Sequence, residues 1–368
     1  MPTINHHEKP FDEGTLAKLE IFEDYAQAWI PTFVMQGCEE IYIFDFFAGP
    51  GKDVNGIDGS PIRILKRVRE HINHIFQKNV KITLFFNEFD KFKFKALQSS
   101  CSEYLEQHKD LERAVSIKYF NRDFCELFDE LLPYMKEYPA LVYLDQNGIK
   151  YTEKYIAKLE KISRTDFLCF VSSSSIWRFG DQDEFKAHLP LDMNEVKSQP
   201  YKFIHRSLIL YLKENLPLET DLKLYPFTLK KGRNIYGIIF GASHLRAVDK
   251  FLSIAWKRNE TNGEANFDID DDHKKGQLNI FNHENLTKIE AFQKMVRENI
   301  LNGRLSNNLE MFIFVMEEGH VAKHAVECIK KMKKDGEISY DTRTPLLTYE
   351  NYKSEKKVDY RIIKNENY

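Results

Sequence analysis

Short apolar runs alternate with longer amphipathic segments through the first half of the chain. The apolar runs, each of strand length, cover residues 41–44, 80–86, 115–120, 140–144 and 166–171. The segments with helical spacing cover residues 15–33, 61–77, 91–107, 125–136 and 152–163. This alternation is typical of a parallel sheet whose crossover helices cover both faces. The pattern therefore predicts an α/β fold with a doubly wound sheet.

The pattern changes after the fifth apolar run. Residues 176–220 are predicted to form a helical insertion with its apolar positions on one face. Two further strands, 222–228 and 234–241, flank a turn at residues 230–233, and a helix over about 245–258 follows them. Because the two strands form a hairpin, we expect an antiparallel last strand at one side of the otherwise parallel sheet.

The C-terminal residues 285–368 have the element order of a winged helix. Helices are predicted over 285–302, 309–316 and 322–332, and the segments 338–340 and 346–349 are predicted to form a two-stranded wing. Residues 319–368 carry 11 Lys and Arg against 8 Asp and Glu, a modest positive charge for a nucleic-acid binder. Winged helices also dock proteins, and DNA or RNA contact is the first interpretation here.

Three parts are therefore predicted along the chain. Residues 1–260 form the sheet domain with its insertion, residues 261–284 form a polar linker or an active-site lid, and residues 285–368 form the winged helix.

The loop after the first predicted strand carries the clearest candidate chemistry. Asp45 ends the strand, Gly49 and Gly51 allow close backbone approach or positive φ, and Ser60 with Pro61 is predicted to start a helix as N-cap and first residue. The loop lacks the Gly-Lys-Ser/Thr of a P-loop and the glycine spacing of a dinucleotide site. An acidic residue with a short Gly-x-Gly is typical of S-adenosylmethionine (SAM) methyltransferases, although a tight turn in another α/β protein has the same pattern.

Polar residues also follow the next two predicted strands. Glu88 follows the second strand, where a carboxylate can accept hydrogen bonds from both ribose hydroxyls of a nucleoside. Asp123 follows the third, and it is predicted either to accept from the adenine amino group, with Phe124 against the ring, or to cap the helix that begins at Phe124. The recurrence of polar residues at strand ends favours a ligand site along that edge of the sheet.

Bulk composition limits the classes of protein that fit. A net charge of −3 gives no global attraction for nucleic acid. The cysteines form no Cys-x-x-Cys pair, which argues for reduced thiols in a cytoplasmic protein and against a zinc site; they stand at positions 38, 101, 125, 169 and 328. No apolar run reaches membrane-spanning length and the N-terminus lacks a signal-peptide core, so we expect no membrane association.

Several of these segments together resemble the three-Cys-motif partner protein family, TcmP. The resemblance rests on Lys18 and Trp29 in the leading helix, Phe44-Asp45-Phe46-Phe47-Ala48-Gly49-Pro50-Gly51, Gly59-Ser60-Pro61, Asn87-Glu88, the strand end at Asp145, residues 238–244 and the winged C-terminus. It implies a Rossmann-like class I methyltransferase fold, SAM as cofactor, and relatives that methylate adenine N6 in nucleic acid. The family name also implies a partner protein with three cysteines, of the iron-sulfur type. Lys18 itself is interpreted as a solvated residue.

The fourth strand end departs from the family pattern. Where the family has Asp-Pro-aromatic-Gly, this chain has Asp145-Gln146-Asn147-Gly148. Asp145 and the Asn147 side chain can still accept hydrogen bonds from an exocyclic amine, so both are predicted as catalytic residues. The ring that would stack on the target base is missing from the motif, and its replacement is expected among Phe46, Phe47, Tyr151 and Trp177.

The sequence therefore predicts a SAM-dependent methyltransferase acting on a base amino group of DNA or RNA, with no metal required. The residues predicted to bind SAM are Asp45, Phe47, Gly49, Gly51, Ser60, Glu88 and Asp123. The alternative is a catalytically lapsed SAM-binding or scaffold protein that docks a partner through its winged helix.

Overall fold

The protein consists of two compact units, Met1–His244 and Leu245–Tyr368. They are seen in a computed structural model that describes residues 10–146, 148, 152–278 and 285–363. No helix in that part of the chain is both long and apolar enough to cross a membrane. The predicted domain boundaries at residues 260 and 284 stay predictions, and residues 279–284 of the predicted linker lie outside the described residues.

The first unit is built on a seven-stranded sheet. Its strands are β1 Glu40–Asp45, β2 Lys81–Asn87, β3 Val115–Phe120, β4 Ala140–Leu144, β5 Thr165–Val171, β6 Lys223–Lys231 and β7 Asn234–Ala242. They lie in the order β3-β2-β1-β4-β5-β7-β6. Strands β1 to β5 are parallel to one another, and β7 is antiparallel to both β5 and β6. The predicted mostly parallel sheet with an antiparallel strand is confirmed.

The strand order reverses between β1 and β4. Asp45, the last residue of β1, lies opposite Phe86 of β2 and Tyr143 of β4. The carboxyl ends of these strands therefore reach the same edge of the sheet, where the diverging crossovers leave room for a ligand. This edge holds the loop after β1, Glu88 after β2 and Asp145 after β4.

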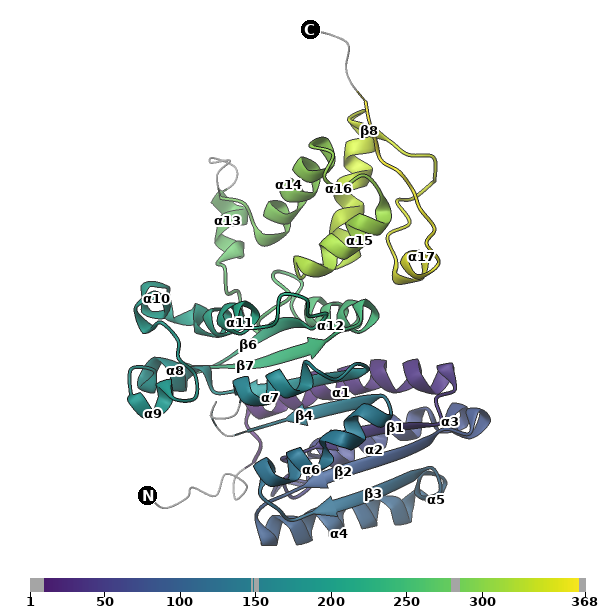
Figure 1. Ribbon diagram of the computed structural model, residues 1–368, viewed down its shortest axis with the longest axis vertical. Coiled ribbons are helices and arrows are strands. Elements are labelled where there is room, and N and C mark those ends of the chain that lie inside the picture. The colour runs from purple at the N-terminus through teal and green to yellow at the C-terminus, as the bar shows by residue number, and fades with distance from the viewer. Residues whose placement is uncertain (1–9, 147, 149–151, 279–284, 364–368) are drawn as a thin grey trace. The chain divides into compact units, whose positions relative to one another are not determined.

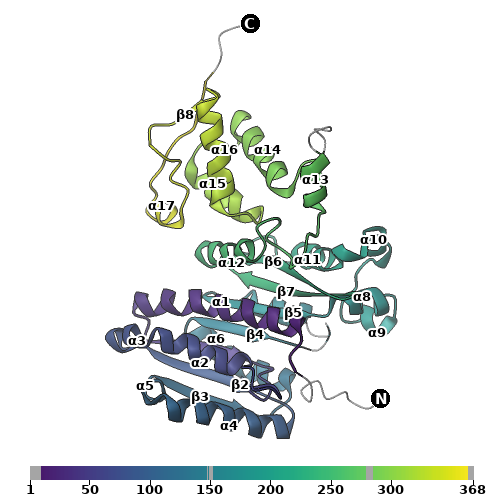
Figure 2. The same cartoon turned by 180° about the vertical axis from the view of Figure 1, so that it is seen from behind.

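Helices cover both faces of this sheet. They are α1 Glu13–Gln36, α2 Ser60–Glu70, α3 Ile72–Lys78, α4 Lys91–Gln107, α5 Lys109–Glu112, α6 Phe124–Glu137 and α7 Thr152–Leu159. Helices α6 and α7 lie on the face seen in Figure 1, and α1 and α2 lie on the face seen in Figure 2. Phe22 of α1 stacks on Tyr143 with ring centroids 4.0 Å apart, and Phe128 of α6 packs against Phe46 at 5.2 Å. Each such buried ring contributes roughly 1.5–3 kcal/mol to the free energy of unfolding.

The chain between β5 and β6 is helical. It contains α8 Ser173–Phe179, α9 Asp183–Lys186, α10 Met193–Ser198, the 3-10 turn Tyr201–Phe203 and α11 Ile204–Glu214. A fully buried histidine, His205, ties this stretch to the sheet: its Nδ1 lies 2.9 Å from Ser173 Oγ and its Nε2 lies 3.2 Å from the Ile238 carbonyl oxygen. A Cβ at Gly237 would lie 2.0 Å from the His205 ring, so glycine is required there.

The second unit is a winged helix-turn-helix preceded by two helices. Its elements are α12 Leu245–Arg258, α13 Asp272–Leu278, α14 Lys288–Leu301, α15 Asn308–Glu317, α16 Ala322–Lys334, β8 Ile338–Ser339, α17 Tyr349–Lys353 and β9 Arg361–Ile362. Strands β8 and β9 pair antiparallel and form the wing. A further bridge joins Asn307 to Asp359.

The predicted second strand of the wing at residues 346–349 is wrong. Tyr349 begins α17, whose cap is the Thr348 side chain accepting from the Asn351 amide at 3.3 Å. Its ring packs near Phe312 of α15, with centroids 6.5 Å apart. Leu347 and Tyr349 are buried on either side of the exposed Thr348, and this alternation of buried and exposed positions matches a strand pattern.

A histidine pair lies in the core of the second unit. His320 and His324 are 3% and 6% exposed, and their Nδ1 atoms lie 3.0 Å apart. His320 stacks on Phe292 with ring centroids 3.9 Å apart, and Trp256 of α12 contacts both imidazoles and donates to the Gly319 carbonyl oxygen at 2.9 Å. Two imidazoles joined through their Nδ1 atoms need one donor and one acceptor, so at least the accepting ring is neutral, and the two rings cannot both be protonated without losing this hydrogen bond.

Candidate functional site

Asp45 is a buried anchor for the loop that follows β1. Its carboxylate is completely buried, and it accepts from Ser60 Oγ at 2.5 Å and from the Phe47 amide at 3.1 Å. Burial raises the pKa of the Asp45 carboxyl to about 7, and the two hydrogen bonds oppose that rise. Repulsion from Asp145 and Glu88 raises the pKa further, so the three carboxylates at this edge share one electrostatic environment.

Ser60 differs from its predicted role. The N-cap of α2 is Gly59, without a side-chain hydrogen bond, and Ser60 is the first residue of the helix with Pro61 after it. The Ser60 hydroxyl donates to Asp45 instead of capping the helix. Local spacing could not distinguish these roles, because the partner lies on another element 15 residues away.

Two glycines shape the loop. Gly49 has φ +63° and Gly51 has φ +84°, a region that side chains other than glycine rarely adopt. A Cβ at Gly51 would lie 2.8 Å from Ser100 Cβ on α4, and the Gly51 carbonyl oxygen accepts from the Gly59 amide at 2.8 Å. Within the described chain the Gly51 amide donates to no acceptor. The loop thus presents a backbone donor that a ligand carboxylate can use.

Glu88 connects the end of β2 to this loop. One carboxylate oxygen accepts from the Gly49 amide at 3.0 Å and the other accepts from the Asp90 amide at 2.8 Å. Burial raises the pKa of Glu88, while the Asp90 amide, Lys93 and the Gly49 amide lower it. A carboxylate offers about four acceptor positions, so two remain for hydroxyl groups of a ligand.

Asp123 is the N-cap of α6. The residue is exposed, and its carboxylate accepts from the Cys125 amide at 2.8 Å. The capping interpretation of Asp123 thus describes its contact, while the adenine contact stays a prediction. Phe124 is 7% exposed and packs on Phe47 with ring centroids 4.9 Å apart.

Asp145 forms an ion pair with Lys18, which reaches it from α1. The two side chains are only 18% and 13% exposed. The Lys18 ammonium also lies 4.6 Å from the centroid of the Phe170 ring at the end of β5. The interpretation of Lys18 as a solvated residue is therefore wrong, because α1 lies against the sheet and directs this side chain to the carboxyl edge of the strands. Sequence spacing within α1 carried no sign of a partner 127 residues away.

Loss of the Lys18 charge should destabilise the protein by about 1–2 kcal/mol, because Asp145 is left partly buried without its partner. We expect Lys18→Met to lower the urea midpoint, and Lys18→Met combined with Asp145→Asn to recover most of it. Lys231→Met is the matched control: its ion pair with Asp12 is over 40% exposed, so we expect almost no change. Equal effects of the two single substitutions would contradict this assignment.

Burial reduces the set of aromatic residues that could stack on a target base. Phe46 is 2% exposed inside the core, which removes it from the predicted set. Phe47 is partly exposed, and Trp177 packs edge-on against Tyr201 at 5.3 Å. Tyr151 and the predicted catalytic residue Asn147 lie outside the described residues. Phe170, which the sequence interpretation missed, is a further partly exposed ring beside Asp145; its position at the end of β5 was the available signal.

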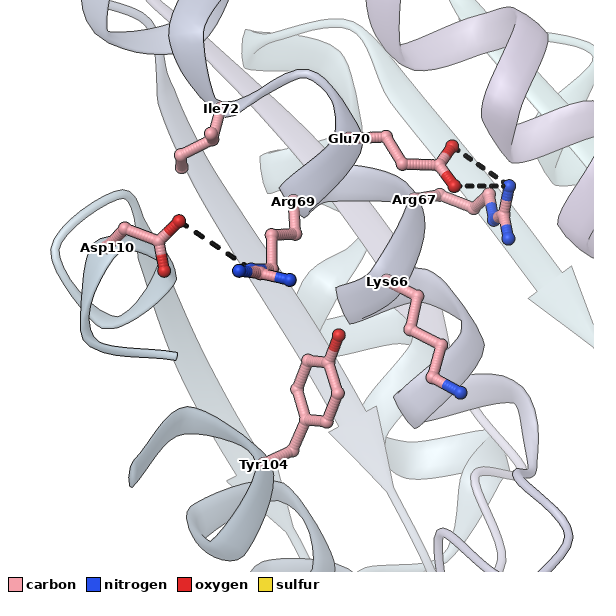
Figure 3. A pocket seen from close by; sticks show the side chains of 7 residues that line it. All are labelled: Lys66, Arg67, Arg69, Glu70, Ile72, Tyr104 and Asp110. Atoms are coloured by element: carbon pink, nitrogen blue, oxygen red, sulfur yellow. Dashed lines mark hydrogen bonds and ion pairs between the residues drawn. The ribbon is translucent and has the colours of Figure 1, made fainter. Parts of the chain in front are cut away.

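A pocket shown in Figure 3 lies away from this edge. Seven side chains line it: Lys66, Arg67, Arg69, Glu70, Ile72, Tyr104 and Asp110. Arg67 pairs with Glu70 at 2.8 Å and Arg69 with Asp110 at 3.6 Å, so acidic side chains face its arginines. Helix α2 begins beside the glycine loop at Ser60 and ends at Glu70, which places this pocket at the opposite end of the helix from the candidate site. In the described part of the chain no cluster of His, Cys, Asp or Glu could hold a metal.

Comparison with protein families supports the winged-helix assignment of the second unit. A model of the GMT-like wHTH domain matches residues 268–345. This match agrees with the helices α15 and α16 and the wing strand β8. Comparison with curated protein sequences gives no match. None of these comparisons addresses the three-Cys-motif partner family, which stays a prediction.

Comparison with solved structures gives matches of low sequence identity and low TM-score. Trm1 from Pyrococcus horikoshii in complex with S-adenosyl-L-methionine is 10% identical, with 66% of this chain and 59% of that chain covered and a TM-score of 0.36. A fibrillarin/Nop5p complex is 14% identical, with coverage of 56% and 73% and a TM-score of 0.30. A putative O-methyltransferase from Klebsiella pneumoniae is 12% identical, with coverage of 63% and 90% and a TM-score of 0.31. The fold is therefore assigned from the strand order of this chain and not from these matches.

Proposed function

We propose that the protein is a SAM-dependent methyltransferase whose acceptor is a base amino group of DNA or RNA. The observation that carries the proposal is the carboxylate of Glu88, which closes on the Gly49 amide beside the reversal of strand order. A carboxylate at this position with two acceptor positions left open fits the two hydroxyls of a ribose.

The remaining groups at this edge fit the charged end of SAM. The free amide of Gly51 suits the methionine carboxylate, and the Glu88 carboxylate, with the partly ionised Asp45 behind it, provides negative potential for a cation. Phe47 is the partly exposed ring of the loop, and Asp123 lies at the next strand end for the adenine. When bound, SAM supplies an electrophilic methyl group, so the protein needs to position the acceptor and exclude water.

Asp145 is suited to orient the acceptor. Its Oδ2 is held by Lys18, whereas its Oδ1 has no hydrogen bond within the described chain. That oxygen can accept from an exocyclic amine and keep the amine in a fixed orientation. The Lys18 ammonium in turn fixes the orientation of the carboxylate.

The nucleic-acid part of the proposal rests on the winged helix. Helix α16 exposes Lys330, Lys331 and Lys334, which have no acidic partner among the residues described. Lysines at the C-terminal end of a helix interact favourably with the negative end of the helix dipole, and ammonium groups without an acidic partner attract phosphates. The iron-sulfur partner implied by the family resemblance stays a prediction.

Calorimetric titration with SAM and with its demethylated product tests the cofactor site. We expect the wild type to bind both, and Glu88→Ala to bind about 30-fold to 150-fold more weakly, because charge-assisted hydrogen bonds contribute roughly 2–3 kcal/mol. Glu103→Ala, which removes an exposed carboxylate paired with Lys52, should bind like the wild type. A wild-type protein that binds neither ligand would overturn the proposal.

A scaffold protein without methyl transfer is the second candidate. The ion pair that occupies Asp145 favours it, because a carboxylate neutralised by Lys18 is a weaker acceptor for a substrate amine. Asp145→Ala distinguishes the two: an enzyme transfers methyl groups to nucleic acid as wild type and loses this activity in the variant while it keeps SAM binding, whereas a scaffold transfers none in either form.

A further inference from the structure

An aromatic and basic surface lies beside the candidate site, at the start of α4. Phe89 follows Glu88 and is 71% exposed, and Phe92 in the first turn of α4 is 85% exposed. Rings this exposed lose the stabilisation that burial would give, and two of them close together in sequence form an unusual surface for a folded domain.

Lysines surround these rings. Lys91 and Lys95 lie one helical turn apart, both are exposed, and neither has an acidic partner in the described part of the chain. The first turn of α4 contains no acidic residue beyond its cap, Asp90, although the helix dipole favours acidic side chains there. The surface thus combines two lysines that form no ion pair with two exposed rings.

The backbone fixes this surface to the carboxyl edge of the sheet. The Asp90 amide donates to Glu88, and Asn121 Nδ2 donates at 2.7 Å to the carbonyl oxygens of both Glu88 and Phe89. Asp90 caps α4 by accepting from the Phe92 and Lys93 amides at 2.8 and 3.0 Å. Phe89 and Phe92 are therefore held by an ordered turn beside Glu88.

We propose that Phe89, Lys91, Phe92 and Lys95 bind a single-stranded segment of nucleic acid, with bases stacked on the rings and phosphates beside the lysines. Exposed rings accept any base face, and ammonium groups accept phosphates, which is the combination that single strands require. A duplex keeps its base faces stacked and cannot use the rings. This inference rests on the proposed function and identifies the acceptor as an unpaired strand.

The test measures binding of a fluorescein-labelled oligothymidine of about 12 nucleotides by anisotropy across a salt series. We expect Phe92→Ser to weaken binding about tenfold without changing the salt slope, because stacking involves no counterion. Lys91→Gln with Lys95→Gln should reduce the slope by about 1.4, since each phosphate contact on a single strand contributes about 0.7. Phe76→Ser is the matched control, a 49% exposed phenylalanine on α3, and should bind like the wild type.

The outcomes separate this surface from the proposed function. The proposed surface is wrong if Phe92→Ser binds the oligonucleotide as tightly as the wild type does, or if the substitution weakens binding of a duplex of the same length equally. It is also wrong if the wild type binds no oligonucleotide, and the ligand of this surface is then a protein. Calorimetry on the same proteins should show unchanged SAM binding by Phe92→Ser. If Phe92→Ser loses oligonucleotide binding but the wild type does not bind SAM, the surface is supported and the proposed methyltransferase function is wrong.

Discussion

Substitution of Gly51 by alanine should abolish measurable SAM binding and lower the free energy of unfolding by about 2–4 kcal/mol. At φ +84° any L side chain is strained, and the new Cβ would lie 2.8 Å from Ser100 Cβ on α4. Relief of that contact moves the loop whose Gly51 amide is proposed to bind the SAM carboxylate. Urea unfolding and calorimetric titration with SAM measure the two effects.

Gly56 provides a control within the same loop. It also has a positive φ, +78°, but a Cβ there meets nothing within 4 Å. Gly56→Ala should therefore cost only the backbone strain, about 1 kcal/mol, and keep SAM binding. If Gly51→Ala matched Gly56→Ala in both measurements, the close approach of Gly51 to α4 would have no role in the site.

Acid should destabilise the second unit by about 4 kcal/mol between pH 6.5 and 4.5. Burial, the charge of Lys288 and His324 lower the pKa of His320 to about 2, and burial with the charges of Lys323 and Lys288 lowers the pKa of His324 to about 4. Below pH 6.5 the unfolded chain binds protons that the folded unit excludes. Stability is thus complete well above that pH and falls by at most about 1.4 kcal/mol per pH unit for each histidine, with a smaller slope near each pKa, so that the two histidines together lose about 4 kcal/mol.

Hydrogen exchange of peptides from α14 and α16, corrected for the intrinsic pH dependence, measures this loss within the second unit. His320→Gln with His324→Gln removes both titrating rings, so its protection should stay nearly constant over the same pH range. His273→Gln, an exposed histidine of the same unit, should keep the wild-type loss. An acid response that survives in the double variant would assign the effect to other groups.

The sheet was predictable from the sequence because each element carries its own signal. Apolar runs bounded by polar residues located β1 to β5, and turn residues located the hairpin of β6 and β7. The prediction of the second wing strand was wrong because strands of only two residues show no detectable periodicity. The two wing strands are Ile338–Ser339 and Arg361–Ile362. Short strands are defined by their partners, which a local pattern does not contain.

The site was predictable only as far as single strand ends. Asp45, Glu88 and Asp145 do lie at one edge, as parallel strands require. Their contacts were not predictable, because the partners are far apart in sequence: Ser60, Gly49 and Lys18 lie 15, 39 and 127 residues, respectively, from the carboxylates that they contact. Burial of Phe46 against α6 was also invisible, since alternation along one strand does not show which face a helix covers.

Provided that SAM binds as proposed, with its ribose at Glu88, the bond between Glu88 and the Gly49 amide limits how this protein could be re-engineered for synthetic alkyl donors. Analogues with an altered ribose would call for a smaller or uncharged residue at position 88, and that change would release the glycine loop at the same time. Analogues with a longer transferable chain on sulfur leave position 88 untouched. Work toward selective labelling reagents should therefore enlarge the surroundings of Phe170 and Asp145 and keep the nucleoside natural.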